Sequence, residues 1–130
     1  MSVDAVVWLL AVLQIGTAIG IVAFWATWLR ADHDEAVLPV GFVEHERAFV
    51  LPDGVLALVL TASAVAGLLE RPIGDRLALV AAGMLLFLGL IDAAYFALNG
   101  MFARDRGGLG NTAIVVWMLL LATVLLARHL

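Results

Sequence analysis

Residues 5–29, AVVWLLAVLQIGTAIGIVAFWATWL, form a run of 25 residues without a charged side chain. An α-helix rises about 1.5 Å per residue, so this run is longer than the hydrocarbon core of a bilayer, which is about 30 Å thick. A cleaved signal peptide has a basic start and an apolar run of about 7–15 residues. This chain begins Met1-Ser2-Val3-Asp4, so we expect the segment to remain in the mature protein as a membrane-spanning helix.

Three further apolar segments follow, at residues 52–69, 77–99 and 109–127. The chain is 65% apolar and 14% charged, whereas about a quarter of the residues in an ordinary soluble domain are charged. These features predict an all-α fold, namely a polytopic membrane protein with a four-transmembrane-helix bundle in a single integral membrane domain over residues 1–130. We expect a prokaryotic cell membrane, with both termini on the same side because the number of spans is even.

Composition excludes several function classes. The chain contains no cysteine, which excludes thiol chemistry, iron–sulfur clusters and attached c-type haem. Its net charge of −4, without a cluster of basic residues, gives nucleic acid nothing to bind. The three histidines lie outside the predicted spans, and the acidic runs lack the spacing of helical metal ligands, so we expect no metal and no cofactor.

The connections between the predicted helices are unequal. The first loop takes about 22 residues from Arg30 to Leu51, whereas the others are as short as loops between antiparallel neighbours usually are. Its apolar middle, residues 36–43, predicts an interfacial segment that lies at the headgroups or over the helix ends. We expect Arg47 to fix this loop by pairing with Glu44 or Asp53.

One carboxyl group is expected inside the membrane. Asp92 lies beyond the centre of the third predicted helix, where a charged side chain is costly. Tyr95 and Asn99 share its face at helical spacing, and Gly89, three residues before it, would let a neighbouring helix approach closely. Asp92 is interpreted either as a functional acid or as a structural acceptor bonded by Tyr95, Asn111 or Arg47.

Connectivity places the polar face of the third predicted helix, formed by Asp92, Tyr95 and Asn99, at the same membrane face as the first loop and the starts of the second and fourth helices. We therefore predict a polar pocket there. In it Asp92 is the acceptor or base, Tyr95 its donor, His45 a proton exchanger and Arg47 the counter-ion. The predicted catalytic residues are Asp92, Tyr95, His45 and Glu44, and the predicted ligand-binding residues are Asn99, Asp53, Arg47, Gln14, Trp25, Trp28 and Asn111.

The first predicted helix sorts its side chains onto two faces. Gln14, Trp25 and Trp28 share one face, and the tryptophans belong either to an aromatic belt at the interface or to a ligand-stacking wall. Gly16 and Gly20 share the opposite face with Ala23 and Thr27, and their spacing allows close contact with another helix. This face would pack against another helix inside the bundle, or join a homodimer or a larger membrane complex.

The expected function is binding of an apolar or lipid-like small molecule, or service as an accessory subunit, with membrane lipids as partners and no nucleic acid. Two alternatives stay open. One is a membrane-embedded acid/base enzyme of isomerase type acting on a lipid or isoprenoid. The other is a small proton-coupled transporter that works as a dimer.

Overall fold

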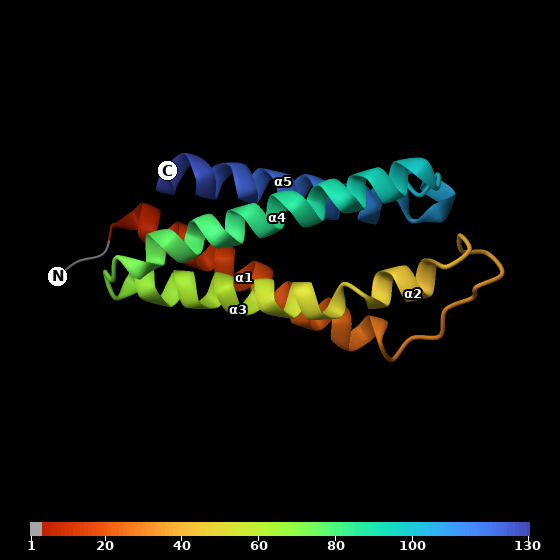
Figure 1. Cartoon of the computed structure of the whole chain (residues 1–130), viewed down its shortest axis with the longest axis horizontal. Coiled ribbons are helices and arrows are strands. Elements are labelled where there is room, and N and C mark those ends of the chain that lie inside the picture. Colours follow the sequence, from red (N-terminus) through yellow and green to blue (C-terminus); the bar gives the residue numbers. More distant parts are fainter. Residues whose placement is uncertain (1–3) are drawn as a thin grey trace. The chain divides into compact units, whose positions relative to one another are not determined.

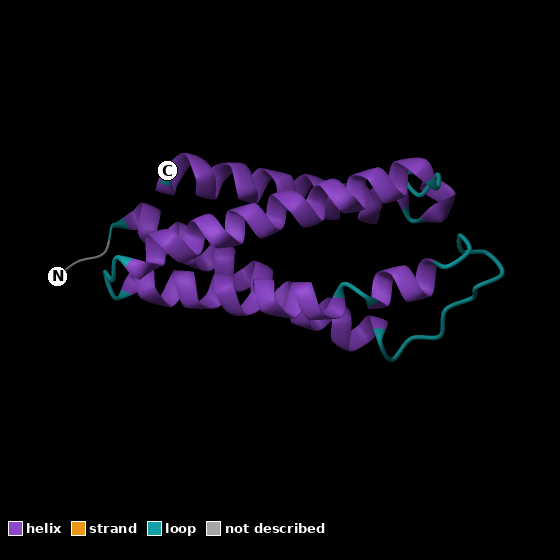
Figure 2. Ribbon diagram, viewed as in Figure 1, coloured by secondary structure: helices purple, strands orange, loops and turns teal. Residues whose placement is uncertain are grey.

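The computed structural model describes residues 4–130, and within this range every regular element is a helix (Figures 1 and 2). Residues 1–3, part of the start on which we argued against a signal peptide, lie outside it. The elements are α1 (Ala5–Trp28), α2 (Phe42–Arg47), α3 (Val50–Leu68), α4 (Ile73–Leu98), the short 3₁₀ helix η1 (Arg104–Arg106) and α5 (Gly108–His129).

Four stretches of helix are long and apolar enough to cross a membrane: Ala5–Trp28, Phe42–Leu68, Ile73–Leu98 and Gly108–His129. The second of them joins α2 and α3. The predicted fold class, an all-α polytopic membrane protein with four spans, is confirmed. The protein is an integral membrane protein.

The chain divides into two compact units, Met1–Leu77 and Ala78–Leu130, with the division inside α4. In the first unit α1 packs lengthwise against α3 (Figure 1). Apolar side chains of both helices are buried, among them Leu10, Ala18, Leu56 and Leu60. The side chain of Asp4 caps the start of α1 by accepting a hydrogen bond from the Val7 amide at 2.9 Å.

The two faces predicted for the first helix are present in α1. Its buried residues are Leu10, Ala11, Gln14, Ala18 and Trp25. The residues of the opposite face, Gly16, Gly20, Ala23 and Thr27, are exposed. The separation follows from the helical period of about 3.6 residues, which places these two sets on different sides of the helix.

Loop one is shorter than the predicted range of residues 30–51, because α2 forms inside it and α3 begins at Val50. Gly41 adopts a left-handed backbone with φ of 78°, which turns the chain into α2. Phe42 and Val43 are buried, so the apolar middle of the loop ends in a packed helix. Glu44 near the start of α2 and Arg47 at its end both suit the helix dipole.

Helix α4 begins at Ile73, four residues before the predicted start at Leu77. We placed Gly74, Asp75 and Arg76 in the preceding loop because they interrupt the apolar run. However, Pro72 immediately precedes the helix, and an acidic residue such as Asp75 is favourable in a first turn. Polar residues therefore extend the helix beyond its apolar part.

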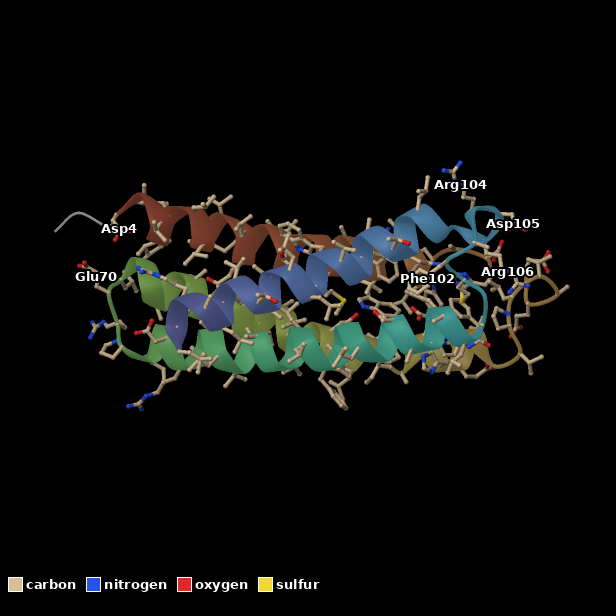
Figure 3. The ribbon with its side chains drawn as sticks, turned by 90° about the horizontal axis from the view of Figure 1, so that it is seen from above. Asp4, Glu70, Phe102, Arg104, Asp105 and Arg106 are labelled. Carbon is tan, nitrogen blue, oxygen red and sulfur yellow. The ribbon has the colours of Figure 1, made fainter. Side chains whose placement is uncertain are left out.

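In the second unit, α5 passes close to α4 at Gly89. A Cβ atom added to Gly89 would lie 3.0 Å from Cδ2 of Leu119, so only a residue without a side chain fits without displacing that leucine. The expected close approach of a neighbouring helix at Gly89 is thus confirmed. Arg104, Asp105 and Arg106 gather in the turn between the two helices (Figure 3).

The end of α3 contains the one non-glycine residue with positive φ in the described part of the chain. Glu70 has φ of 56°, while the Arg71 amide donates to the Ala66 carbonyl oxygen at 2.8 Å. This is the helix-ending turn in which glycine is the preferred residue at the left-handed position. Glu70 lies at the connection between α3 and α4 (Figure 3).

We expect Glu70→Gly to raise the free energy of unfolding by about 1 kcal/mol, because the left-handed backbone is unfavourable for a residue with a Cβ atom. Thermal unfolding in mild detergent, followed by circular dichroism, measures the change. Arg71→Gly is the matched control, since its backbone is not left-handed. Equal effects of the two substitutions would contradict the prediction.

Candidate functional site: a tryptophan–carboxylate pair at the end of α1 and α3

The first polar link of the first unit lies midway along α1. The Gln14 Nε2 atom donates to Ser63 Oγ at 3.0 Å, and Ser63 Oγ donates to the Gly74 carbonyl oxygen at 3.0 Å. Gln14 is 3% exposed and Ser63 is 4% exposed. Gln14, which we predicted to bind a ligand, therefore forms a hydrogen-bonded chain that connects α1, α3 and the first turn of α4.

The second polar link lies near the end of α1. The Trp25 Nε1–H group donates to Asp53 Oδ2 at 2.8 Å. Trp25 is 6% exposed, so it lies inside the helix pair and does not belong to an aromatic belt facing lipid. Asp53 is half-buried in the first turn of α3, and its backbone amide donates to the Phe49 carbonyl oxygen at 2.9 Å. The indole thus fixes one oxygen of a carboxyl group inside a candidate membrane span.

Aromatic rings continue from Trp25 toward the membrane surface. The ring centroids of Trp25 and Trp28 are 5.3 Å apart in an edge-to-face arrangement. The His33 ring lies against Trp28 with centroids 4.1 Å apart and an interplanar angle of 31°, and its Nε2 atom is 2.9 Å from the Trp28 carbonyl oxygen. We call Trp25, Trp28, His33 and Asp53 the tryptophan–carboxylate site.

His33 is the member of this site that the sequence analysis missed. It follows Trp28 by five residues, in the turn after α1, where a ring can fold back onto the last helical turn. A histidine just after a helix that ends in tryptophan is a weak signal. Such a histidine predicts a contact with the carbonyl groups at the helix end more readily than it predicts a ligand-binding site.

The predicted site residues of the first loop, Glu44, His45 and Arg47, lie on α2 and have different surroundings. The His45 ring packs against Phe49 with centroids 5.1 Å apart, and Glu46 is buried. Glu44 and Arg47 are exposed, and among residues 4–130 Arg47 forms no ion pair with Glu44 or with Asp53. The expected fixing of the loop by Arg47 is therefore wrong, because packing of the apolar residues of α2 holds the loop instead.

In the second unit, Asp92 and Tyr95 are half-buried on α4, and the Tyr95 ring lies edge-to-face against Phe96 with centroids 6.4 Å apart. Asp92 is three residues beyond the close approach at Gly89. Within this unit, the hydrogen bonds of the Asn111 amide go to the carbonyl oxygens of Met101 and Arg106 and not to Asp92. The catalytic roles of Asp92, Tyr95, His45 and Glu44 stay predictions.

The two asparagines predicted to bind a ligand stabilise the local backbone. Asn99 Nδ2 donates to the Tyr95 carbonyl oxygen at 2.9 Å, and Arg106 donates to the Asn99 carbonyl oxygen at 3.0 Å. Asn111 Nδ2 donates to the Met101 carbonyl oxygen at 2.7 Å. These bonds close the turn between α4 and α5.

The structure brings together three of the predicted site residues, Trp25, Trp28 and Asp53, within the first unit. Asp92, Tyr95, Asn99 and Asn111 belong to the second unit. Over residues 4–130, no group of three or more His, Cys, Asp or Glu side chains could hold a metal ion. The function has to be inferred from the chain's own residues, since the chain matches no protein-family model, no curated protein and no solved structure.

Proposed function

We propose that this small integral membrane protein binds a lipid-like small molecule at the tryptophan–carboxylate site. Its apolar helices give a hydrophobic ligand direct access from the bilayer. The two tryptophans lie in the last turns of α1, which is the level where amphipathic molecules place their polar heads. The ligand would place its polar group at Asp53 and its apolar chain along the helices.

The observation that carries this proposal is the state of the Asp53 carboxyl group. In the described chain, its side chain receives one hydrogen bond, from Trp25 to Oδ2, and no Arg or His pairs with it. A carboxyl group within a membrane span normally has a partner or serves a function, because an isolated charge there is costly. The Oδ1 atom is therefore the position at which a ligand would bind.

The proposal also includes the protein's cellular location and its topology in the membrane. We infer that the protein resides in a prokaryotic cell membrane, with both termini on one side because the number of spans is even. The tryptophan–carboxylate site then lies at the membrane face opposite the termini, because α1 runs from the amino terminus toward it.

Native mass spectrometry of the full chain, extracted gently from its own membrane, tests the binding function. We expect an adduct of lipid-like mass on the natural protein and on Asp105→Asn, which changes an exposed carboxylate in the turn between α4 and α5. Asp53→Asn should lose most of this adduct while it keeps its helical circular dichroism spectrum. An adduct equally retained by Asp53→Asn would refute the site.

A second candidate function, that of a subunit in a homodimer or membrane complex, is favoured by the glycine face of α1. Gly16 and Gly20 are exposed, and a Cβ atom added to either would meet no atom within 4 Å. Another helix could therefore approach this face closely. The same spectra would show a stoichiometric protein partner that is lost in Gly20→Leu, and its absence from the natural protein would exclude this function.

A further inference from the structure

We propose that the polar group recognised at the tryptophan–carboxylate site is an ammonium group, either a protonated amine or a quaternary ammonium, carried by the lipid-like ligand. This inference rests on the function proposed above and adds the chemical class of the ligand's head. The site would hold the positive charge between Asp53 Oδ1 and the exposed part of the Trp28 ring.

The first step of the argument is the chemistry of the side chains that meet here. A carboxylate attracts a cation, and indole rings attract one through the negative potential of their faces, tryptophan most strongly. Trp25 contacts both partners, since it donates to Asp53 and lies 5.3 Å from Trp28 between ring centroids. An anionic ligand head would meet repulsion from Asp53, and a neutral apolar head would leave its Oδ1 atom without a partner.

The second step is the absence of a competing cation at Asp53 among residues 4–130. The chain contains no lysine, and the nearest arginine in sequence, Arg47, is exposed and not paired with Asp53. No ion pair of Asp53 exists within residues 4–130. A positive group that pairs with Asp53 would therefore come from outside this part of the chain.

The third step is the distribution of charge along the sequence. Residues 30–53 contain six acidic residues and two arginines, whereas the acidic residues and arginines of the rest of the chain balance, five against five. The whole net charge of −4 is thus concentrated in the segment that leads from the end of α1 to Asp53. Asp32, Asp34, Glu35 and Glu44 of this segment are exposed, so their field attracts cations toward this end of the unit.

The fourth step is the partial exposure of the Trp28 and His33 rings. Trp25 is buried and serves to orient Asp53, whereas Trp28, His33 and Asp53 are all half-buried. His33 lies against Trp28 and keeps that ring in place. An ammonium group can therefore reach the carboxylate and the exposed part of the Trp28 ring without displacing Trp25.

The test is a fluorescence titration of the full chain in neutral maltoside micelles. Trp8→Phe/Trp117→Phe serves as the background, so that the emission comes from Trp25 and Trp28. The probes are dodecyltrimethylammonium and dodecanol, which share an alkyl chain and differ in the charge of the head. We expect saturable quenching by dodecyltrimethylammonium, with an affinity about tenfold or more above that for dodecanol.

Variants assign the effect to the site. Asp53→Asn should weaken binding of dodecyltrimethylammonium about tenfold or more, and so should Trp28→Leu, which leaves the bond between Trp25 and Asp53 in place. Asp105→Asn removes an equal charge from the exposed turn between α4 and α5 and should bind nearly as the background protein does. If Asp53→Asn loses its helical spectrum, Trp28→Leu decides the question. Unchanged affinity for dodecyltrimethylammonium in folded Asp53→Asn or Trp28→Leu would overturn the assignment.

The outcomes separate this inference from the proposed function. Equal binding of dodecanol and dodecyltrimethylammonium, both lost in the variants, would refute the ammonium head and support a lipid-like ligand. Binding of neither probe would refute both. Tetramethylammonium and nanodiscs of phosphatidylethanolamine or phosphatidylglycerol identify the source of the head. Quenching by tetramethylammonium without a response to either nanodisc indicates a free ammonium compound. A shift of the tryptophan emission that is specific to phosphatidylethanolamine indicates a lipid headgroup.

Discussion

Gly108→Ala is expected to lower the free energy of unfolding by about 3 kcal/mol, at the upper end of what overpacking usually costs. Gly108 is the first residue of α5, and its amide donates to the Ala103 carbonyl oxygen at 2.9 Å. An added Cβ atom would come within contact distance of backbone atoms of Phe102 and Ala103. Backbone in a tight turn cannot move aside as the end of a side chain can, so the turn between α4 and α5 would have to open.

Gly110→Ala is the matched control for this substitution. It lies two residues further along the same helix, is exposed, and its added Cβ atom would meet nothing within 4 Å. Because alanine favours helix more than glycine does, Gly110→Ala should be neutral or more stable by up to about 1 kcal/mol. Thermal unfolding in mild detergent compares the two variants. A Gly108→Ala protein as stable as Gly110→Ala would show that the turn does not depend on this close contact.

Trp25→Phe is expected to cost about 1.5–3 kcal/mol of stability, the range for a hydrogen bond to a charged group. The phenyl ring keeps most of the apolar contact but removes the N–H group that Asp53 Oδ2 accepts. The loss should be larger than that of Trp8→Phe, because Trp8 is 55% exposed on the outer surface of α1.

A double-mutant cycle with Asp53→Ala isolates this bond, because alanine removes the oxygen that accepts it. If it stabilises the α1–α3 pair, the double variant will be more stable than the sum of the two single effects predicts. The four proteins are compared by thermal unfolding in one detergent. Strict additivity would show that the contact between the indole and the carboxyl group contributes nothing to the fold.

Most of the fold could be predicted from the sequence, because membrane spans depend on the length and hydropathy of uncharged runs. The run at residues 5–29 corresponds to α1 at Ala5–Trp28, and the run at 109–127 to α5 at Gly108–His129. The errors occur where polar residues continue a helix, as in the first turn of α4. A short helix such as α2 is also hard to predict, because its stability comes from the burial of Phe42 and Val43 rather than from its six residues alone.

The candidate site could be predicted only in part. Trp25, Trp28 and Asp53 were identified by residue type and position, but the bond between Trp25 and Asp53 joins residues 28 apart in the sequence. No spacing rule connects residues of different helices. The bonds that Asn99 and Asn111 form could not be predicted, because an amide near a helix end serves local backbone as readily as a ligand, and the sequence does not show which carbonyl groups lack a donor. Their ligand-binding roles stay predictions.

The hydrogen-bonded chain from Gln14 through Ser63 to Gly74 has a consequence for insertion into the membrane. Gln14 enters the bilayer 49 residues ahead of the hydroxyl group that accepts its amide. Until α3 and the start of α4 have been synthesised, this amide needs another partner, because lipid offers none. The first helix can therefore cross the membrane early, but it reaches its final register only after α3 and the start of α4 arrive. A slip of one turn would then leave the amide facing hydrocarbon, so the late bond also selects the correct alignment.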